Sequence, residues 1–136
     1  MADHKVSARV KKAIAACTDP AVAYRKFNEV PSGRGEEERL WYVRWIELMD
    51  IDARTNASSC TDIAVARQKY KEPLSGSEAE RIWYARWVEL ADAGAKADAA
   101  SCVDVAVARQ KCRESPRDSE AKAIWELPWA ELIYSA

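Results

Sequence analysis

Residues 81–94, RIWYARWVELADAG, predict an amphipathic helix, because their apolar positions repeat with the period of one helix face. These positions follow one another at i, i+4, i+7 and i+8: Trp83, Trp87, Leu90 and Ala91. Just before this stretch, Ser77 and Glu80 match a capping box, whose side chains satisfy backbone N–H groups at a helix start. We expect Gly94 to end the helix, since glycine is the commonest residue after a helix C-terminus.

The same pattern recurs along the chain with a period of 42 residues. The six tryptophans form three pairs: Trp41 and Trp45, Trp83 and Trp87, and Trp125 and Trp129. Segments 60–94 and 102–136 are identical at 17 of 35 aligned positions. The first copy starts at Cys17 and carries one extra residue near Pro31. We infer three copies of one unit, over residues 17–59, 60–101 and 102–136.

An alanine-rich segment precedes the Trp-bearing stretch in each unit. In the third copy, residues 95–114 contain no Gly or Pro and predict one continuous helix. Its small side chains lie on two adjoining faces, so we expect this helix to be sandwiched between neighbours on both sides. In the first copy Pro20 interrupts the pattern, which predicts a separate N-terminal helix over about residues 4–16.

Loop-forming residues fall at one phase of the repeat, at 31–35, 73–76 and 115–118. Their spacing fits short connections between antiparallel helices. The sequence therefore predicts one all-α domain over residues 1–136, built from three tandem helical hairpins of about 42 residues with an extra N-terminal helix. A short right-handed stack is favoured, and a closed six-helix bundle satisfies the same periodicity.

Composition narrows the classes of function. Lys and Arg total 21 against 22 Asp and Glu, a formal charge of −1, which argues against nucleic acid as a partner. The basic N-terminal helix is the one place where nucleic-acid binding stays open. The single histidine, His4, argues against His-based catalysis and multi-His metal sites. No apolar run is long enough to predict a membrane span.

The tryptophan pairs are the first candidate site. They could line a ladder that binds a peptide, a pigment or another flat ligand, or they could pack one hairpin against the next. The packing role is favoured, because repeats in an array must bury their own interfaces and the alanine-rich segments supply little bulk.

Two Arg–Glu pairs at i,i+3 spacing, Arg44 with Glu47 and Arg86 with Glu89, are the second candidate. Such pairs on a helix surface stabilise it by a few tenths of a kcal/mol. A catalytic role would need a nucleophile or base beside them, so we interpret the pairs as structural. The third copy has Pro128 in place of the arginine, which we expect to bend or restart the last helix.

The cysteines predict neither a metal site nor a redox site. Cys17, Cys60 and Cys102 are equivalent, Cys112 replaces an aromatic residue, and none has C-x-x-C spacing. We expect buried, reduced thiols and a reducing intracellular compartment, cytoplasmic by default. Nucleotide-binding and hydrolase motifs are missing, so no cofactor is expected.

The Trp-rich helix ending in Glu-Leu, together with residues 66–70, ARQKY, resembles half-a-TPR and tetratricopeptide-type repeats over most of 35–114. Those families pair helices in hairpins and serve as protein-interaction scaffolds. The period of 42 differs from the roughly 34 residues of that family, and the Trp spacing differs too. The resemblance implies helical hairpins and a scaffold role, and it transfers no binding residues.

From these patterns we expect a non-enzymatic helical repeat protein that binds a protein partner or associates with itself. A small-ligand or pigment binding protein that uses the Trp-bearing helices is the alternative.

Overall fold

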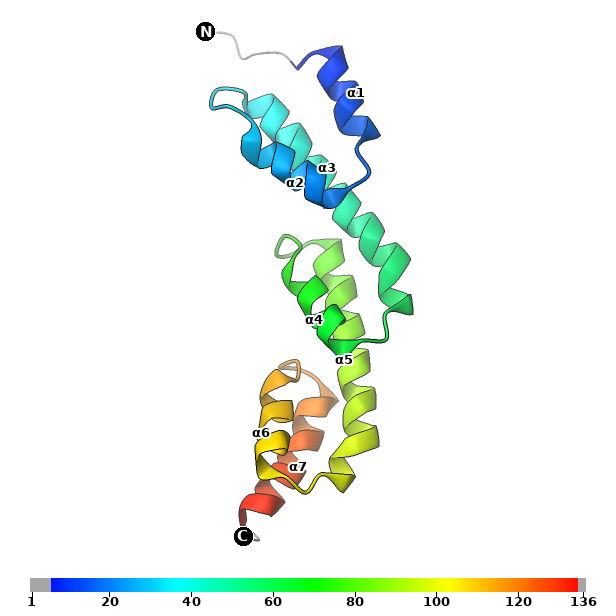
Figure 1. Ribbon diagram of the computed structural model, residues 1–136, viewed down its shortest axis with the longest axis vertical. Helices are drawn as coiled ribbons and strands as arrows, with labels where there is room; N and C mark the ends of the chain where they lie inside the picture. Colours follow the sequence, from blue (N-terminus) through cyan, green and yellow to red (C-terminus); the bar gives the residue numbers. More distant parts are fainter. Residues whose placement is uncertain (1–5, 135–136) are drawn as a thin grey trace.

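The computed structural model describes residues 6–134, which fold into seven α-helices and two short 3₁₀ turns (Figure 1). The helices are α1 (Ala8–Ala16), α2 (Pro20–Glu29), α3 (Gly35–Asn56), α4 (Ile63–Lys71), α5 (Glu78–Asp98), α6 (Val105–Glu114) and α7 (Glu120–Tyr134). The 3₁₀ turns, η1 (Ala57–Ser59) and η2 (Ala99–Ser101), follow the two longest helices.

The helices pair as three hairpins, α2 with α3, α4 with α5 and α6 with α7, and α1 packs on α3. The predicted all-α fold with an extra N-terminal helix is thereby confirmed. The long helices also contact one another, α3 with α5 and α5 with α7. The hairpins therefore form an open row, with α1 and α7 at opposite ends, and not the closed bundle that the periodicity also allowed (Figure 1).

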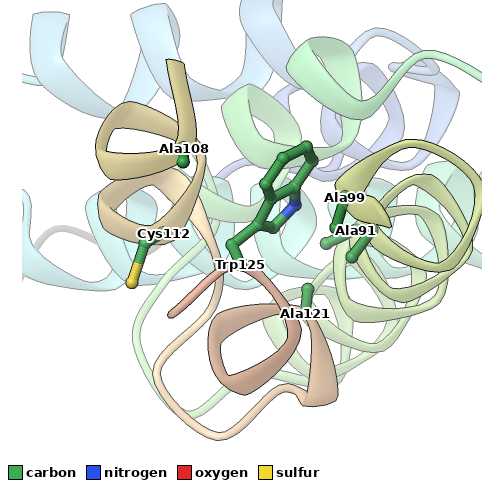
Figure 2. Packing of buried hydrophobic residues seen from close by; sticks show 7 residues of the cluster. Ala91, Ala99, Ala108, Cys112, Ala121 and Trp125 are labelled. Atoms are coloured by element: carbon green, nitrogen blue, oxygen red, sulfur yellow. The ribbon is translucent and has the colours of Figure 1, made fainter. Parts of the chain in front are cut away.

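Two of the three core clusters join successive units through alanines and tryptophans. In the last cluster, Trp125 of α7 lies between α5 and α6 (Figure 2). The other buried members are small: Ala91, Ala95, Ala99, Ala108, Cys112 and Ala121. Small side chains let the helix backbones approach closely, and the indole fills the space that remains between them.

The first cluster shows what α1 contributes. Ile14 of α1 packs with Ala23, Trp41 and Leu48. In the aligned repeats Ile14 occupies the position of Ala57 and Ala99, which lie just after the long helices α3 and α5. Helix α1 therefore takes the place that the C-terminal half of a long helix holds in the later units.

The same hydrogen bond recurs at both junctions between successive long helices. The Asp50 carboxylate of α3 accepts a hydrogen bond of 2.9 Å from the backbone N–H of Ala79, at the start of α5. Asp92 of α5 does the same for Ala121 of α7, at 2.8 Å. A carboxylate that satisfies a free N–H in a helix first turn stabilises that helix start.

Ion pairs reinforce both junctions. Arg54 of α3 donates two hydrogen bonds to the Glu78 carboxylate of α5, at 3.0 and 2.8 Å. The equivalent pair, Lys96 and Glu120, lies at 3.1 Å.

The predicted helix over 95–114 is wrong, and so is the expected stop at Gly94. Helix α5 runs through Gly94 to Asp98, and α6 begins only after Asp104. Burial of Ala95 and Ala99 against the third unit extends α5, whereas the Asp104 carboxylate accepts a hydrogen bond of 2.9 Å from Ala106 N–H and starts a new helix.

The short helices are not sandwiched. Helices α2, α4 and α6 each pack mainly against their own hairpin partner, and the opposite face of each is exposed. The expectation fails because the long helices make the contacts between units, so each short helix needs only one buried face. In α6 that face consists of Ala108 and Cys112.

The two ends of the chain test two further expectations. Of the helix predicted over about 4–16, residues 4 and 5 lie outside the described part, and the observed helix begins at Ala8. Helix α7 is continuous through Pro128 and does not restart there. Residues 135 and 136 of the third unit also lie outside the described part. Within residues 6–134, no helix is long and apolar enough to cross a membrane.

Candidate functional site

The first tryptophan of each pair lies deep in a core cluster. Trp83 is 2% exposed, and Trp41 and Trp125 are nearly as buried. The second tryptophans are less uniform, since Trp87 is buried whereas Trp45 and Trp129 are half-buried. The six residues therefore form no continuous exposed ladder along the described chain.

Aromatic neighbours surround the second tryptophan in the first two units. The Trp45 ring centroid lies 4.8 Å from that of Tyr24, and the Trp87 centroid lies 5.5 Å from that of Tyr70. In the third unit Cys112 stands where Tyr70 stands in the second, so Trp129 lacks this partner. Trp45 and Trp87 contribute both to packing and to the surface between units.

The two candidate arginines bind backbone carbonyls in addition to their glutamates. Arg44 Nε and Nη2 donate to the carbonyl oxygen of Cys17 at 2.9 and 2.7 Å, and Arg86 Nε donates to that of Cys60 at 2.7 Å. These carbonyls belong to the link that precedes each short helix. The arginine therefore ties its long helix to the chain entering the same hairpin.

The glutamates of these pairs are exposed. Arg44 reaches Glu47 at 3.3 Å, and Arg86 reaches Glu89 at 2.9 Å. Exposed pairs of this kind contribute little to stability, about 0–1 kcal/mol, whereas charged hydrogen bonds to a part-buried carbonyl contribute more. The sequence indicated the glutamate partner but carried no local signal for the carbonyl.

Three of the four cysteines, Cys17, Cys60 and Cys102, occupy repeated positions, and all four are free thiols. The Sγ atoms of Cys17, Cys60 and Cys102 lie 3.4–3.5 Å from the carbonyl oxygens of the aspartates two residues later. Cys112 is buried, and burial raises the pKa of its thiol. Among residues 6–134 no group of His, Cys, Asp or Glu side chains is arranged to hold a metal ion.

Two equivalent grooves separate successive short helices, and sequence reasoning missed both. We call them the α2–α4 groove and the α4–α6 groove. Each lies between the start of one short helix and the end of the next, with the long helix of the first hairpin as its floor. Trp45 lines the first groove and Trp87 the equivalent place in the second. Their volumes are about 510 and 480 Å³.

Exposed β-branched side chains on the short helices are a second feature that sequence reasoning did not identify. Ile63 and Val65 of α4 are 41% and 44% exposed, and the equivalent Val105 and Val107 of α6 are each 41% exposed. We call these four residues the β-branched row. The signal was present in the sequence, because each pair follows a helix-capping aspartate, Asp62 or Asp104, at the same spacing.

Comparisons of the chain with protein families, with curated proteins and with solved structures found no match.

Proposed function

We propose that this chain is a non-enzymatic interaction module, which presents the face formed by α2, α4 and α6 to a protein partner or to copies of itself. The observation that carries the proposal is the β-branched row, because the same two apolar positions are exposed in two successive units. Stacked repeats produce extended surfaces of this kind, which suit binding to another macromolecule.

Helix formation does not account for the β-branched row, and the fold buries its side chains only in part. Val65 and Val107 leave about two fifths of their surface in water and belong to none of the three core clusters. β-branched residues are weaker helix formers than alanine, leucine or lysine. Burial against a partner would recover the hydrophobic free energy that the free protein forgoes at these positions.

The resemblance to half-a-TPR and tetratricopeptide-type repeats supports the same role. It rests on the paired helices of each unit and on the residues 66–70, and those families act as protein-interaction scaffolds. The likeness supports the class of function and names no partner.

The proposal is tested by replacing one residue of the β-branched row on each of α4 and α6 without changing the core. In the variant Val65→Gln/Val107→Gln both new side chains are polar, and glutamine is a good helix former, so the fold is expected to persist. Val43→Gln on α3 is the matched control, because Val43 is 44% exposed, as Val65 is, but lies on a long helix. Circular dichroism verifies that both variants fold.

Partners are identified by crosslinking and mass spectrometry, and self-association by light scattering. We expect the specific partner, or the self-associated species, to be retained by Val43→Gln and lost with the double variant. Equal recovery with all three proteins would overturn the proposal.

The second candidate, a small-ligand or pigment binding protein, is favoured by one observation. Trp87 and Trp125 both line the α4–α6 groove, whose volume of about 480 Å³ falls in the range of small-molecule sites. Native mass spectrometry of the purified chain tests this function, which requires added mass or visible absorption. A protein of bare chain mass, still bare after incubation with cell extract, would exclude it.

A further inference from the structure

The α2–α4 groove serves as an internal reference for the α4–α6 groove, because the repeat places equivalent residues around both. On the floor of the α2–α4 groove, Met49 lies beside Trp45. The Asp52 carboxylate on the same floor pairs with Lys69 of α4, at 3.9 Å. The floor of this groove therefore carries a large side chain, Met49, and a carboxylate, Asp52, that pairs with the groove's lysine.

The floor of the α4–α6 groove has neither the large side chain nor the carboxylate. Ala91 replaces Met49, and Gly94 replaces Asp52. The lysine is kept, as Lys111, but within residues 6–134 it forms no ion pair. A Cβ atom added at Gly94 would meet nothing within 4 Å, so no neighbouring group requires a glycine there. What the glycine leaves is open space on the groove floor.

The α4–α6 groove also has two cationic side chains, Arg67 and Lys71, at positions where the first unit has uncharged residues. Arg67 stands in place of Tyr24, and its guanidinium carbon lies 5.7 Å from the Trp87 ring centroid. Its Nε is buried and has no hydrogen-bond partner in the described part of the chain. Lys71 stands in place of Asn28 and also lines the groove. A buried guanidinium N–H without an acceptor costs free energy.

The balance of charge is opposite in the two grooves. The α4–α6 groove is lined by three cations, Arg67, Lys71 and Lys111, and by two carboxylates, Asp98 and Glu114. Glu114 already accepts a hydrogen bond of 2.8 Å from Gln110. The α2–α4 groove has one cation, Lys69, against three carboxylates: Asp19, Asp52 and Glu72.

We infer that the α4–α6 groove binds an acidic peptide segment of a protein partner, which places carboxylates against Arg67 and Lys111 and an apolar side chain over Gly94, beside Trp87. Ile63 of the β-branched row lines the same groove and offers an apolar contact to the segment. The inference rests on the proposed function and names the chemistry of its partner. Charge complementarity distinguishes this occupant from a basic or a neutral peptide.

The experiment selects ligands without assuming one. A random library of short peptides displayed on phage is panned against the immobilised full chain at neutral pH. We expect enrichment of sequences that combine Asp or Glu with a neighbouring Leu, Ile or Phe. Failure to enrich any sequence, or enrichment of basic or purely apolar sequences, would overturn the inference.

The selected peptide, labelled with fluorescein, is then titrated by fluorescence polarisation. The variant Arg67→Tyr/Gly94→Asp gives the α4–α6 groove two residues of the α2–α4 groove, and we expect affinity to fall about tenfold or more. Lys111→Gln, a change at an exposed residue, should also lower the affinity. This single variant tests the inference if the double variant does not fold. The matched control, Lys69→Gln in the other groove, should leave affinity within about twofold.

Three outcomes would overturn the assignment. One is affinity that survives both groove variants, and another is equal loss with the Lys69→Gln control. The third is a wild-type dimer that becomes a monomer in the groove variants, because the occupant would then be a second copy of this chain. If the inference fails while the β-branched row still binds a partner, the proposed function stands without this groove.

Discussion

Arg86 Nε donates a hydrogen bond of 2.7 Å to the carbonyl oxygen of Cys60, 26 residues earlier in the chain. The acceptor belongs to the link between η1 and α4, and the donor belongs to α5. The bond therefore joins the long helix of the second hairpin to the segment that precedes its short helix. Arg44 and Cys17 form the same contact in the first hairpin. In the third hairpin Pro128 stands in place of the arginine and cannot make it.

Replacing Arg86 should destabilise the fold. Arg86→Met keeps much of the aliphatic length but leaves the part-buried Cys60 carbonyl without this donor, and we expect a loss of about 1–3 kcal/mol in the free energy of unfolding. Urea denaturation measures it. Glu89→Gln is the control and should cost less than about 0.5 kcal/mol, since Glu89 is exposed. A larger effect at Glu89 than at Arg86 would show that the surface pair stabilises the helix and the carbonyl contact does not.

Gly94→Ala should stabilise the protein. Gly94 lies inside α5, its φ is not in the positive region, and an added Cβ meets nothing within 4 Å. Alanine is favoured over glycine in a helix interior by about 0.5–1 kcal/mol. Thermal denaturation should therefore show a higher Tm. Gly76→Ala is the opposite control, because Gly76 has a φ of 84° that alanine adopts poorly, and it should lower the Tm. A lower Tm for Gly94→Ala would contradict the open groove floor.

Features that depend on residues close together in sequence could be predicted, whereas features that depend on contacts between distant segments could not. The Trp pairs and the loop residues are local signals, and they predicted three hairpins correctly. The end of α5 was missed because it depends on the burial of Ala95 and Ala99 against a later unit. The Arg86 contact and the α4–α6 groove were missed for the same reason, since each joins segments that lie far apart in sequence.

Stability should depend on pH through the contact between units one and two. Hydrogen bonds from the Arg54 guanidinium lower the pKa of the Glu78 carboxyl below its ordinary value of 4.5. A lowered folded-state pKa means that this contribution is present above the unfolded-state pKa and is lost as the pH falls through the folded-state value.

Unfolding by urea between pH 7 and pH 3 measures this dependence. Below about pH 4.5 the wild type should lose more stability than Glu78→Gln, whose side chain does not titrate. Glu131→Gln, at an exposed residue of α7, should follow the wild type. Parallel pH profiles for the wild type and Glu78→Gln would refute this role of the ion pair.

The four thiols should differ in reactivity. Burial and the nearby Glu126 carboxylate raise the pKa of the Cys112 thiol, so its thiolate is scarce in the folded state. Cys17, Cys60 and Cys102 are only half-buried. We expect iodoacetamide at pH 8 to alkylate these three first and to reach Cys112 only after denaturation, as peptide mass spectrometry would show. Early labelling of Cys112 would mean that the third core cluster opens readily.

Site-specific photo-crosslinking from the β-branched row tests whether this surface binds a protein partner or a second copy of the chain. A benzophenone amino acid is placed at Val65 or Val107, and at Ala85, an exposed residue of α5, as the control. We expect one discrete covalent adduct from Val65 and from Val107, to a partner or to a second copy, and none from Ala85. No adduct from either row position, or equal adducts from all three, would contradict it.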